Sequence, residues 1–530
     1  MDRRAAITAA IALVAAESDR AEATARASPV PGGATAAELT ARVPIVREGF
    51  VPGDVRRYGA LGDGNTDDSS AWRAALSTGH RVLGGGPEHV YCLDQQLSVA
   101  RSTIIDLQGA MVRPRGNTFA FVRSVPAPSA SATVVSGATQ GSRSLTLVST
   151  AGFRPGQWTR LVLNDFPTHD ASSYPPSWAH VIAVHGDALE LDTPLQVNYG
   201  SGTLSVLGYE PVALAERFEC VNGIFDGSAS SYDVATGQAL RIGGIERVRV
   251  QGCEFRDFRH GGELTCAVEL FTNVDVLMSD CRFTGGTSRF NICDIQDARF
   301  AHFVDNQIDG SHFGVNLTRI DAGLFANNSL QGRRAWEAAS GITPERSVRG
   351  LKAYGCAAIR ILGNHAADYE SPIKVQACFR YDVSHNTIFN AGLAPFAGQI
   401  ALNIGSIAHG QNMRDGRIIG NHVEHCGGTG IGITSDSPGG VCISGNIVRG
   451  TQARGIFVNV PNAIISGNRV EDWGLRNAGD PAVYVYGAAS IVDNRFAHSS
   501  LTSLPCIGSA DAGGALVLRD NVSENGNRMG

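Results

Sequence analysis

The feature that most constrains this chain is a short unit, apolar-polar-asparagine-apolar, that recurs through its second half. Clear examples are VDNQI at Asn306, SHNTI at Asn386 and SGNIV at Asn446. In two earlier units, VQGCEF and MSDCRF, Cys253 and Cys281 stand where the later units have asparagine. The complete series is Asn222, Cys253, Cys281, Asn306, Asn328, Asn364, Asn386, Asn421, Asn446, Asn468, Asn494 and Asn521.

These twelve positions are separated by 22 to 36 residues, about 27 on average. A repeat of this length built from short β-rich segments indicates a solenoid, because one coil cannot bury its inner face without neighbours. Stacked coils pair as parallel strands about 4.8 Å apart, so equivalent residues form ladders along the axis. An asparagine at a bend can bond backbone groups there and its counterpart in the next coil. We therefore assign these asparagines to the fold and not to chemistry.

Composition supports a globular fold with frequent turns and narrows the function. The chain has 63 glycines in 530 residues, 18% charged residues and a formal net charge of −6. It has no run of basic residues, which argues against a nucleic-acid partner. It also has no apolar stretch long enough to predict a membrane span. The eleven cysteines include no C-x-x-C pair, so we expect buried thiols and neither a zinc site nor a dense disulfide framework.

The N-terminus has the pattern of a bacterial export signal. Arg3 and Arg4 precede an alanine-rich apolar run, Ala5 to Ala16, and the segment AEA at 21–23 supplies a small-x-small cleavage site. This pattern predicts a secreted or periplasmic protein. A helical or disordered tail is the alternative.

The sequence divides into five parts. Residues 1–23 are the predicted signal and 24–49 a linker rich in Ala, Pro, Thr and Gly. Residues 50–127 form an N-terminal cap and the first coils. Residues 128–210 alternate in a β pattern without the ladder unit, which predicts a small β insertion, and 211–530 carry the repeat.

A second motif precedes the repeat, in the string GALGDGNTDDSS at 59–70. Its glycines permit a tight turn, Asp67 or Asp68 can cap a short helix from Ser69 to Leu76, and that helix can plug the end of the core. The string resembles the N-terminal signature of the pectate-lyase-like superfamily. The resemblance implies a single-stranded right-handed parallel β-helix from about residue 50 to 525. It identifies fold better than activity, because lyases, hydrolases, epimerases and phage tailspikes share it.

A second strand can be aligned in each coil, for example RGLKAY, SPIKVQ and RGIFVN. Taking the Ile, Leu and Val positions as inward fixes an outward set, because side chains alternate along a strand. In the RFNICD segment two registers are possible: either Asn291 and Cys293 face outward, or Asp294 does. We expect the long segments 332–349 and 405–415 to wall this face. The outward set is Arg241, Glu269, Asn316, Lys352, Lys374, Asn403, Phe457 and Tyr484.

A ridge of polar side chains at the strand spacing suits a linear glycan. Phe457, Tyr484 and Tyr486 would offer flat surfaces to sugar rings, and Asn316 and Asn403 would offer polar contacts.

Lys352 and Lys374 carry the sharpest chemical prediction, because their frames place them outward on adjacent coils. Two neighbouring ammonium groups lower each other's pKa, so one lysine could remove the C5 proton of a uronate while the other neutralises its carboxylate. Tyr354, on the same face, would protonate the leaving oxygen. Asp368 and Glu370 would hold a calcium ion or pair with the lysines; no other cofactor is indicated. This β-elimination resembles the use of lysine in some β-helix alginate and glycosaminoglycan lyases, whose full motifs are absent here.

Two alternatives remain. A glycoside hydrolase needs paired carboxyl groups, for which Glu269, Asp294 and Asp297 are candidates, although the G-H-G and R-x-K strings of the polygalacturonase type are missing. His312 and Arg319 flank the GVNLT strand and suit either mechanism as acid or carboxylate anchor. The other alternative is a tailspike-like or adhesin-like protein that binds a polysaccharide without cutting it. A tailspike-like protein would form a homotrimer.

Overall fold

The structure is a computed structural model. It describes residues 33–115, 119–163, 177–199, 204–210, 213–228, 238–258, 266–285, 291–311, 314–332, 349–392, 400–405, 415–434, 440–476, 479–499, 505–510 and 516–524. The predicted signal at 1–23, His312 and nearly all of the two long segments at 332–349 and 405–415 lie outside these residues.

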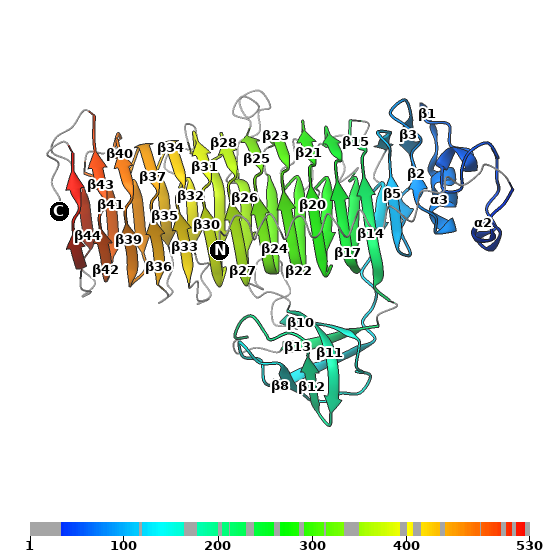
Figure 1. Cartoon of the computed structure of the whole chain (residues 1–530), viewed down its shortest axis with the longest axis horizontal. Helices are drawn as coiled ribbons and strands as arrows, with labels where there is room; N and C mark the ends of the chain where they lie inside the picture. Colours follow the sequence, from blue (N-terminus) through cyan, green and yellow to red (C-terminus); the bar gives the residue numbers. More distant parts are fainter. Residues whose placement is uncertain are drawn as a thin grey trace, which may run out of the picture.

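The chain forms a right-handed parallel β-helix of about 14 turns, with nearly all regular structure in strands. Its strands stack along one long axis, with two short helices at one end and strand β44 near the other (Figure 1). Three ribbons of parallel strands run the length of the solenoid, here named A, B and C. Ribbons A and B together make a 25-stranded sheet, and ribbon C is a separate 15-stranded sheet.

The strands of each ribbon follow in chain order. Ribbon A contains β4 (Leu97–Ser98), β7 (Phe121–Arg123), β16 (Leu240–Gly243), β19 (Val268–Phe271), β22 (Cys293–Val304), β24 (Val315–Ala326), β26 (Arg349–Tyr354), β29 (Ser371–Gln376), β32 (Leu402–Gly405), β35 (Ile431–Thr434), β38 (Ile456–Asn459), β41 (Val483–Tyr486) and β44 (Ile507–Ala510). Ribbon B contains the second halves of β22 and β24 together with β2 (Val82–Leu83), β5 (Thr103–Asp106), β14 (Ala215–Val221), β17 (Ile245–Gln251), β20 (Asp275–Ser279), β27 (Ala358–Leu362), β30 (Arg380–Ser384), β33 (Gly416–Ile419), β36 (Val441–Ser444), β39 (Ala463–Ser466), β42 (Ala489–Val492) and β45 (Leu516–Arg519). Ribbon C contains β1 (Asp63–Asp67), β3 (Val90–Leu93), β6 (Met111–Pro114), β15 (Ile224–Asp226), β18 (Glu254–Arg256), β21 (Arg282–Thr284), β23 (Gln307–Ser311), β25 (Ser329–Gly332), β28 (His365–Ala367), β31 (Thr387–Phe389), β34 (His422–Cys426), β37 (Ile447–Thr451), β40 (Arg469–Glu471), β43 (Arg495–Ala497) and β46 (Val522–Ser523).

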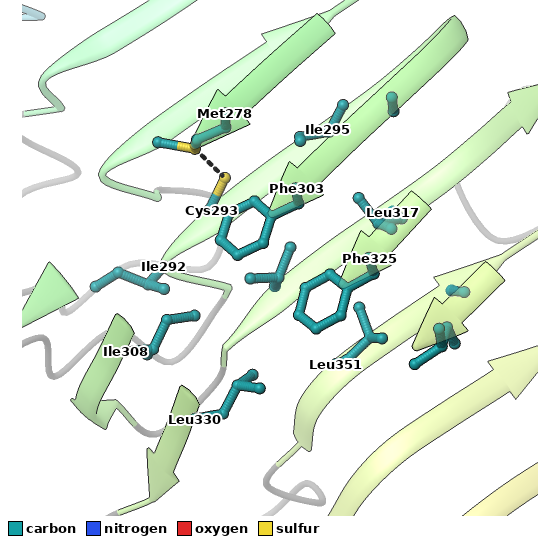
Figure 2. Close-up of a cluster of buried hydrophobic side chains, with 14 of the residues drawn as sticks. Met278, Ile292, Cys293, Ile295, Phe303, Ile308, Leu317, Phe325, Leu330 and Leu351 are labelled. Carbon is teal, nitrogen blue, oxygen red and sulfur yellow. Dashed lines mark hydrogen bonds between the residues drawn. The ribbon is translucent and has the colours of Figure 1, made fainter. Parts of the chain in front are cut away.

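The core is a column of like side chains stacked from coil to coil. Parallel pairing puts equivalent residues one above another, so Phe303 and Phe325 stack with ring centres 5.1 Å apart (Figure 2). Cys293 lies in the same cluster, and its thiol donates to the sulfur of Met278 at 3.7 Å. All eleven cysteines are free thiols and ten of them are buried, as the sequence predicts.

The asparagine ladder is confirmed as a structural device. The Oδ1 of Asn421 accepts hydrogen bonds from the backbone N and the Nδ2 of Asn386 at 3.0 and 2.9 Å, and its own Nδ2 donates to Asn446 at 2.9 Å and to the Val383 carbonyl at 2.8 Å. The same contacts recur from Asn306 to Asn521. The backbone N of Cys281 donates to Asn306 at 2.9 Å, which places this cysteine in the ladder frame.

The first member of the predicted ladder is wrong by one residue. Ile224 pairs with Glu254, so Gly223 aligns with Cys253, and Asn222 aligns with Gly252 at the preceding bend. Asn222 has φ +58°, and Gly252 has φ +60°. Asparagine tolerates this left-handed conformation, which explains its presence in the motif without a ladder role.

The solenoid has more coils than the twelve predicted ladder positions. The backbone N of Ile224 bonds to the Ala110 carbonyl at 3.1 Å and that of Met111 to the His89 carbonyl at 2.9 Å, so two further coils precede the first counted one. Their ladder positions hold His89 and Ala110. Because these two coils have no asparagine at this position, the repeat motif does not appear in their sequence.

The N-terminal end of the core is covered by α3 (Ser69–Thr78), the predicted plug. Its Trp72 is fully buried and lies 5.4 Å from the Tyr91 ring. Asp67 accepts from the backbone N of Ser69 at 3.0 Å, whereas Asp68 turns back to the backbone N atoms of Leu61 and Gly62 at 2.7 and 3.1 Å. Asp68 is the N-cap of α3, but its carboxylate closes the glycine turn, while Asp67, one residue earlier, binds the first N–H of the helix.

Part of the predicted linker is also ordered against this cap. It contains α2 (Ala36–Ala41), whose N-cap Thr35 forms a capping box with Glu38. Glu38 makes a fully buried ion pair with Arg57 at 2.6 Å and accepts from the Tyr58 hydroxyl at 2.8 Å. A buried charge needs such partners, so this part of 24–49 is packed structure and not a free linker.

A closed antiparallel barrel occupies the region predicted as a β insertion and projects from one side of the solenoid (Figure 1). Its strands are β8 (Ala130–Ser136), β9 (Ser144–Leu147), β10 (Trp158–Leu163), β11 (Trp178–His185), β12 (Ala188–Leu191) and β13 (Leu204–Tyr209). Arg160 of the barrel donates to Asp297 of the solenoid at 2.7 Å. The backbone N atoms of Ser177 and Trp178 donate to buried Asp321 at 3.1 and 3.0 Å. In the part of the chain that is described, no helix is long and apolar enough to cross a membrane.

Candidate functional site

The predicted outward residues form one continuous row on ribbon A. Strand register pairs each with its counterpart in the next coil; Lys352 pairs with Lys374, and Lys374 pairs with Asn403. Their strand neighbours Ile373 and Val375 point into the core and are buried. The full row is Ser98, Val122, Arg241, Glu269, Asp294, Asn316, Lys352, Lys374, Asn403, Gly432, Phe457, Tyr484 and Gly508. The predicted outward register is confirmed for all eight residues, which are about 4.8 Å apart per coil.

The strand register also shows which residue of the RFNICD segment faces outward. Asp294 pairs with Glu269 and with Asn316, so it stands in the row, whereas Cys293 is fully buried. Both carboxylate oxygens of Asp294 accept from amides, one from Asn316 Nδ2 at 2.9 Å and the other from Gln296 Nε2 at 2.5 Å. Burial raises the pKa of Asp294 to about 6, although these hydrogen bonds oppose the rise.

Lys352 and Lys374 are the only two lysines in the chain, against 42 arginines. Because lysine is so rare in this chain, an abundance of lysine does not explain why these two residues lie next to each other. Burial lowers the pKa of Lys374 to about 8, and the positive charges of Arg349 and Lys352 lower it further, while Glu370 acts in the opposite sense. Lys352 therefore lowers the pKa of Lys374, as predicted, but burial lowers it more.

Tyr354 lies on the same face as Lys352, as predicted, and the Lys352 ammonium stands 4.9 Å from the centre of its ring. Only 3% of Tyr354 is exposed. A proton donor must reach the leaving oxygen of the substrate, so this burial gives Tyr354 less access than its predicted role requires.

Asn316 is the clearest unsatisfied acceptor of the row. Its Nδ2 donates to Asp294 and to Thr318 Oγ1, the latter at 2.7 Å. Its Oδ1 is buried and accepts no hydrogen bond from the described residues. Because a buried acceptor without a donor is costly, this oxygen is suited to receive a hydroxyl of a bound molecule.

The remaining carboxylate of the row, Glu269, forms an ion pair with Arg241 at 3.0 Å. It occupies the position next to Asp294. This places the two predicted hydrolase carboxyls on adjacent strands.

Arg319 lies at the bend that follows the row, not on the row itself. Its backbone has φ +54°, and its guanidinium forms an ion pair with Asp297, which has φ +54° at the equivalent bend. Asp297 also binds Arg160 of the barrel at 2.7 Å. The third hydrolase candidate, Asp297, is thus held between two arginines and joins the barrel to the edge of the row.

The aromatic residues form a cluster at the C-terminal end of the row. Phe457 and Tyr484 are stacked with ring centres 6.2 Å apart, and Tyr486 stands edge-on to both at 5.9 and 5.2 Å. The guanidinium of Arg454 lies over the rings of Phe457 and Tyr484 at 5.1 and 4.6 Å and is paired with Asp480 at 3.4 Å. The sequence pattern predicted the three rings, but not Arg454, which lies just before its strand.

Both predicted calcium ligands, Asp368 and Glu370, interact with neighbouring side chains. Asp368 accepts from Gln331 at 2.6 Å, and Glu370 is 5% exposed and acts on the charge of Lys374. No group of three or more His, Cys, Asp or Glu side chains suited to a metal is found in the described part of the chain. The two roles predicted for Asp368 and Glu370 are binding calcium and pairing with the lysines. Glu370 fits the second role, because its negative charge raises the pKa of Lys374.

Comparison with known proteins identifies the architecture. No model of a protein family matches the chain, and no curated protein matches it in sequence. Its structure is similar to the tailspike protein gp49 from Pseudomonas phage LKA1, with a TM-score of 0.54, 12% identity, and coverage of 88% of this chain and 81% of that chain. The similarity is lower for the gp54 tailspike of Acinetobacter baumannii bacteriophage AP22, with a TM-score of 0.43, 10% identity, and coverage of 88% and 74%. For PfbA, a surface adhesin of Streptococcus pneumoniae, the TM-score is 0.39 at 10% identity, with coverage of 87% and 93%.

At such identities the likeness establishes the fold alone. The chain belongs in the structural class of right-handed parallel β-helix proteins, as the resemblance to the pectate-lyase-like superfamily implied.

Proposed function

We propose that the protein binds an acidic polysaccharide along the outward row of ribbon A and cleaves it by β-elimination. The observation that carries this proposal is the pair of lysines at the centre of the row. A base that works near neutral pH must release its proton, which arginine does not do. A chain that otherwise uses arginine for its cations carries lysine only at these two adjacent positions.

Lys374 acts as the base. With a pKa of about 8, a useful fraction of it is neutral near pH 7 to 8. The neutral amine takes the C5 proton of a uronate residue, the C5–H electron pair forms the C4=C5 double bond, and the C4–O bond to the leaving sugar breaks. The leaving oxygen takes a proton from water, because Tyr354, the predicted donor, is only 3% exposed. Lys352 neutralises the carboxylate, and this makes the C5 proton more acidic.

The other row residues hold the polymer. The Asn316 Oδ1 accepts a sugar hydroxyl, Asn403 binds on the opposite side of the lysines, and Phe457 and Tyr484 receive a sugar ring. Arg319, fixed by Asp297, anchors a carboxylate at the edge of the row. His312 keeps its proposed role as acid or anchor.

Glycoside hydrolysis is the second candidate, favoured by the raised pKa of Asp294 beside Glu269. One carboxyl group would protonate the leaving oxygen and the other would act as nucleophile or base. Both oxygens of Asp294 already accept from amides, and protonation would cost one of these bonds. Elimination by the lysines therefore fits the geometry better.

A third possibility is binding without cleavage, as in a homotrimeric spike or a surface adhesin. The structural similarity to a phage tailspike protein supports this third possibility. Export to the periplasm or the medium is part of the proposal, since the substrate of such a protein lies outside the cell.

The decisive experiment incubates the purified protein with acidic and neutral polysaccharides and records two signals. Elimination produces ultraviolet absorbance from the unsaturated uronate together with new reducing ends. Hydrolysis produces reducing ends alone, and a binding protein produces neither while retaining affinity. Repeating the assay with a chelator tests calcium, and light scattering tests the trimer.

A further inference from the structure

The charge along the row changes in blocks. After the uncharged Ser98 and Val122, Arg241 is paired with Glu269, and Glu269 and Asp294 supply two carboxylates on adjacent strands. The neutral Asn316 follows, then the two lysines. Beyond them the row holds Asn403, Gly432, Phe457, Tyr484 and Gly508, none of which is charged.

The aromatic end offers a surface for an uncharged sugar. The rings of Phe457 and Tyr484 are stacked in the row, and Tyr486, which is 38% exposed, closes one side. Arg454, which lies over both rings, has its charge paired with Asp480. Such rings favour the apolar C–H face of a pyranose over a carboxylate.

The two ends lie a fixed distance apart along the axis. From Lys374 to Phe457 there are three strand spacings, about 14 Å. An extended pyranose chain advances per residue by about as much as the solenoid advances per coil. An acidic sugar at the lysines therefore places a sugar about three residues away on the aromatic rings.

A homopolymer of uronic acids would fit this pattern poorly. It carries a carboxylate on every residue, so one would face Asp294 and another the apolar rings. Like charges side by side are unfavourable, and burying a carboxylate against a ring without a partner is costly. Of the cations in and beside the row, Arg241 is paired with Glu269 and Arg319 with Asp297, so the main matching charges are those of Lys352 and Lys374.

We propose that the row takes a heteropolysaccharide with one acidic sugar in each repeat and, about three residues away, an uncharged sugar that stacks on Phe457 and Tyr484. This inference rests on the proposed function, since it places the acidic sugar at the two lysines. It specifies the substrate class: a polymer of mixed repeat and not a polyuronate.

The test compares polymers of the two classes on the intact protein. Gellan carries one glucuronate in each repeat of its main chain, whereas polygalacturonate and polymannuronate are acidic at every residue. Affinity is measured by calorimetry and elimination by ultraviolet absorbance. We expect a mixed polymer to bind at least tenfold more tightly than either homopolymer. Phe457→Ala and Tyr484→Ala should each weaken that binding about tenfold, the order of one lost stacking contact.

Phe300→Ala is the matched control, because Phe300 is 39% exposed on ribbon B, away from the row. Its affinity should equal that of the wild type. Tightest binding or fastest elimination with a homopolymer would overturn the inference and leave the proposed function intact. Unchanged affinity of both aromatic variants for a mixed polymer would also overturn it. If no polymer is bound or cleaved, the proposed function fails and the inference falls with it.

Discussion

Lys374 occupies the position directly after Lys352 in a parallel ladder, so the only two lysine side chains of the protein leave adjacent strands on the same face. Parallel pairing repeats this placement without any offset, because equivalent residues in neighbouring coils are about 4.8 Å apart. Each charge therefore acts on the other, and the pKa of Lys374 is lowered in part by Lys352.

Replacing the base should lower turnover strongly. We expect Lys374→Ala to lower kcat by about 10² or more, the usual contribution of general base catalysis. Lys374→Arg should not rescue it, since the guanidinium keeps its proton, whereas Lys352→Arg should lose less because it keeps the charge that neutralises the carboxylate. Steady-state rates on the cleaved polymer, together with melting curves, make the measurement. Wild-type activity in Lys374→Arg would remove this residue as the base and bring Asp294 and Glu269 forward.

The two lysines can be titrated individually. Protein labelled with carbon-13 at lysine Cε should give two side-chain signals in an NMR titration, one of them with a pKa near 8. In Lys352→Met this pKa should rise, because removal of a positive charge favours the protonated form of Lys374. The rising limb of the pH–activity profile should follow the same pKa, as the neutral amine is the active form. Two signals that both titrate near the ordinary value of 10.5 would contradict the assignment.

Breaking the asparagine ladder should destabilise the fold without touching the row. Asn421→Ala removes the acceptor of the backbone N of Asn386 in a fully buried position, whereas the Asn386 Nδ2 keeps its bonds to the Ile361 and Ser384 carbonyls. Such an unsatisfied group costs about 1–3 kcal/mol of unfolding free energy. Chemical denaturation should show the loss, and Asn459→Ala, at an exposed position, is the control. Equal stability of the two variants would mean that the ladder contributes little.

Attachment of the barrel should depend on pH through Asp321. Burial raises the pKa of Asp321 to about 7 from 3.8, although the backbone N atoms of Ser177 and Trp178 donate to its oxygens. Arg299 opposes the rise and Asp297 adds to it. An acid whose folded pKa lies above its unfolded pKa binds more protons when folded, so its contribution to stability falls as pH rises from about 4 to 7. The melting temperature of Asp321→Asn minus that of the wild type should therefore increase across this range. A difference independent of pH would show that Asp321 does not titrate there.

The sequence by itself determined the solenoid, the ladder and the row. A repeat whose inward positions are apolar has one register, because a shift by one residue would turn every core side chain outward. Once Ile373 and Val375 point inward, Lys374 must point outward, and the same logic places Phe457 and Tyr484. The motif did not predict the coils at His89 and Ala110, because their ladder positions hold no asparagine. At Asn222 it predicted the ladder position one residue too early.

The tertiary structure decided what alternation cannot encode. Only folding brings Asn316 and Gln296 to the half-buried Asp294 and raises its pKa, and only docking of the barrel places Arg160 against Asp297. These contacts join residues that are distant in sequence, and their energies depend on local burial, which one strand does not reveal. The lysine pair depends on both the sequence and the tertiary structure. The sequence places the two ammonium groups side by side, and burial in the folded solenoid sets the proton affinity of Lys374.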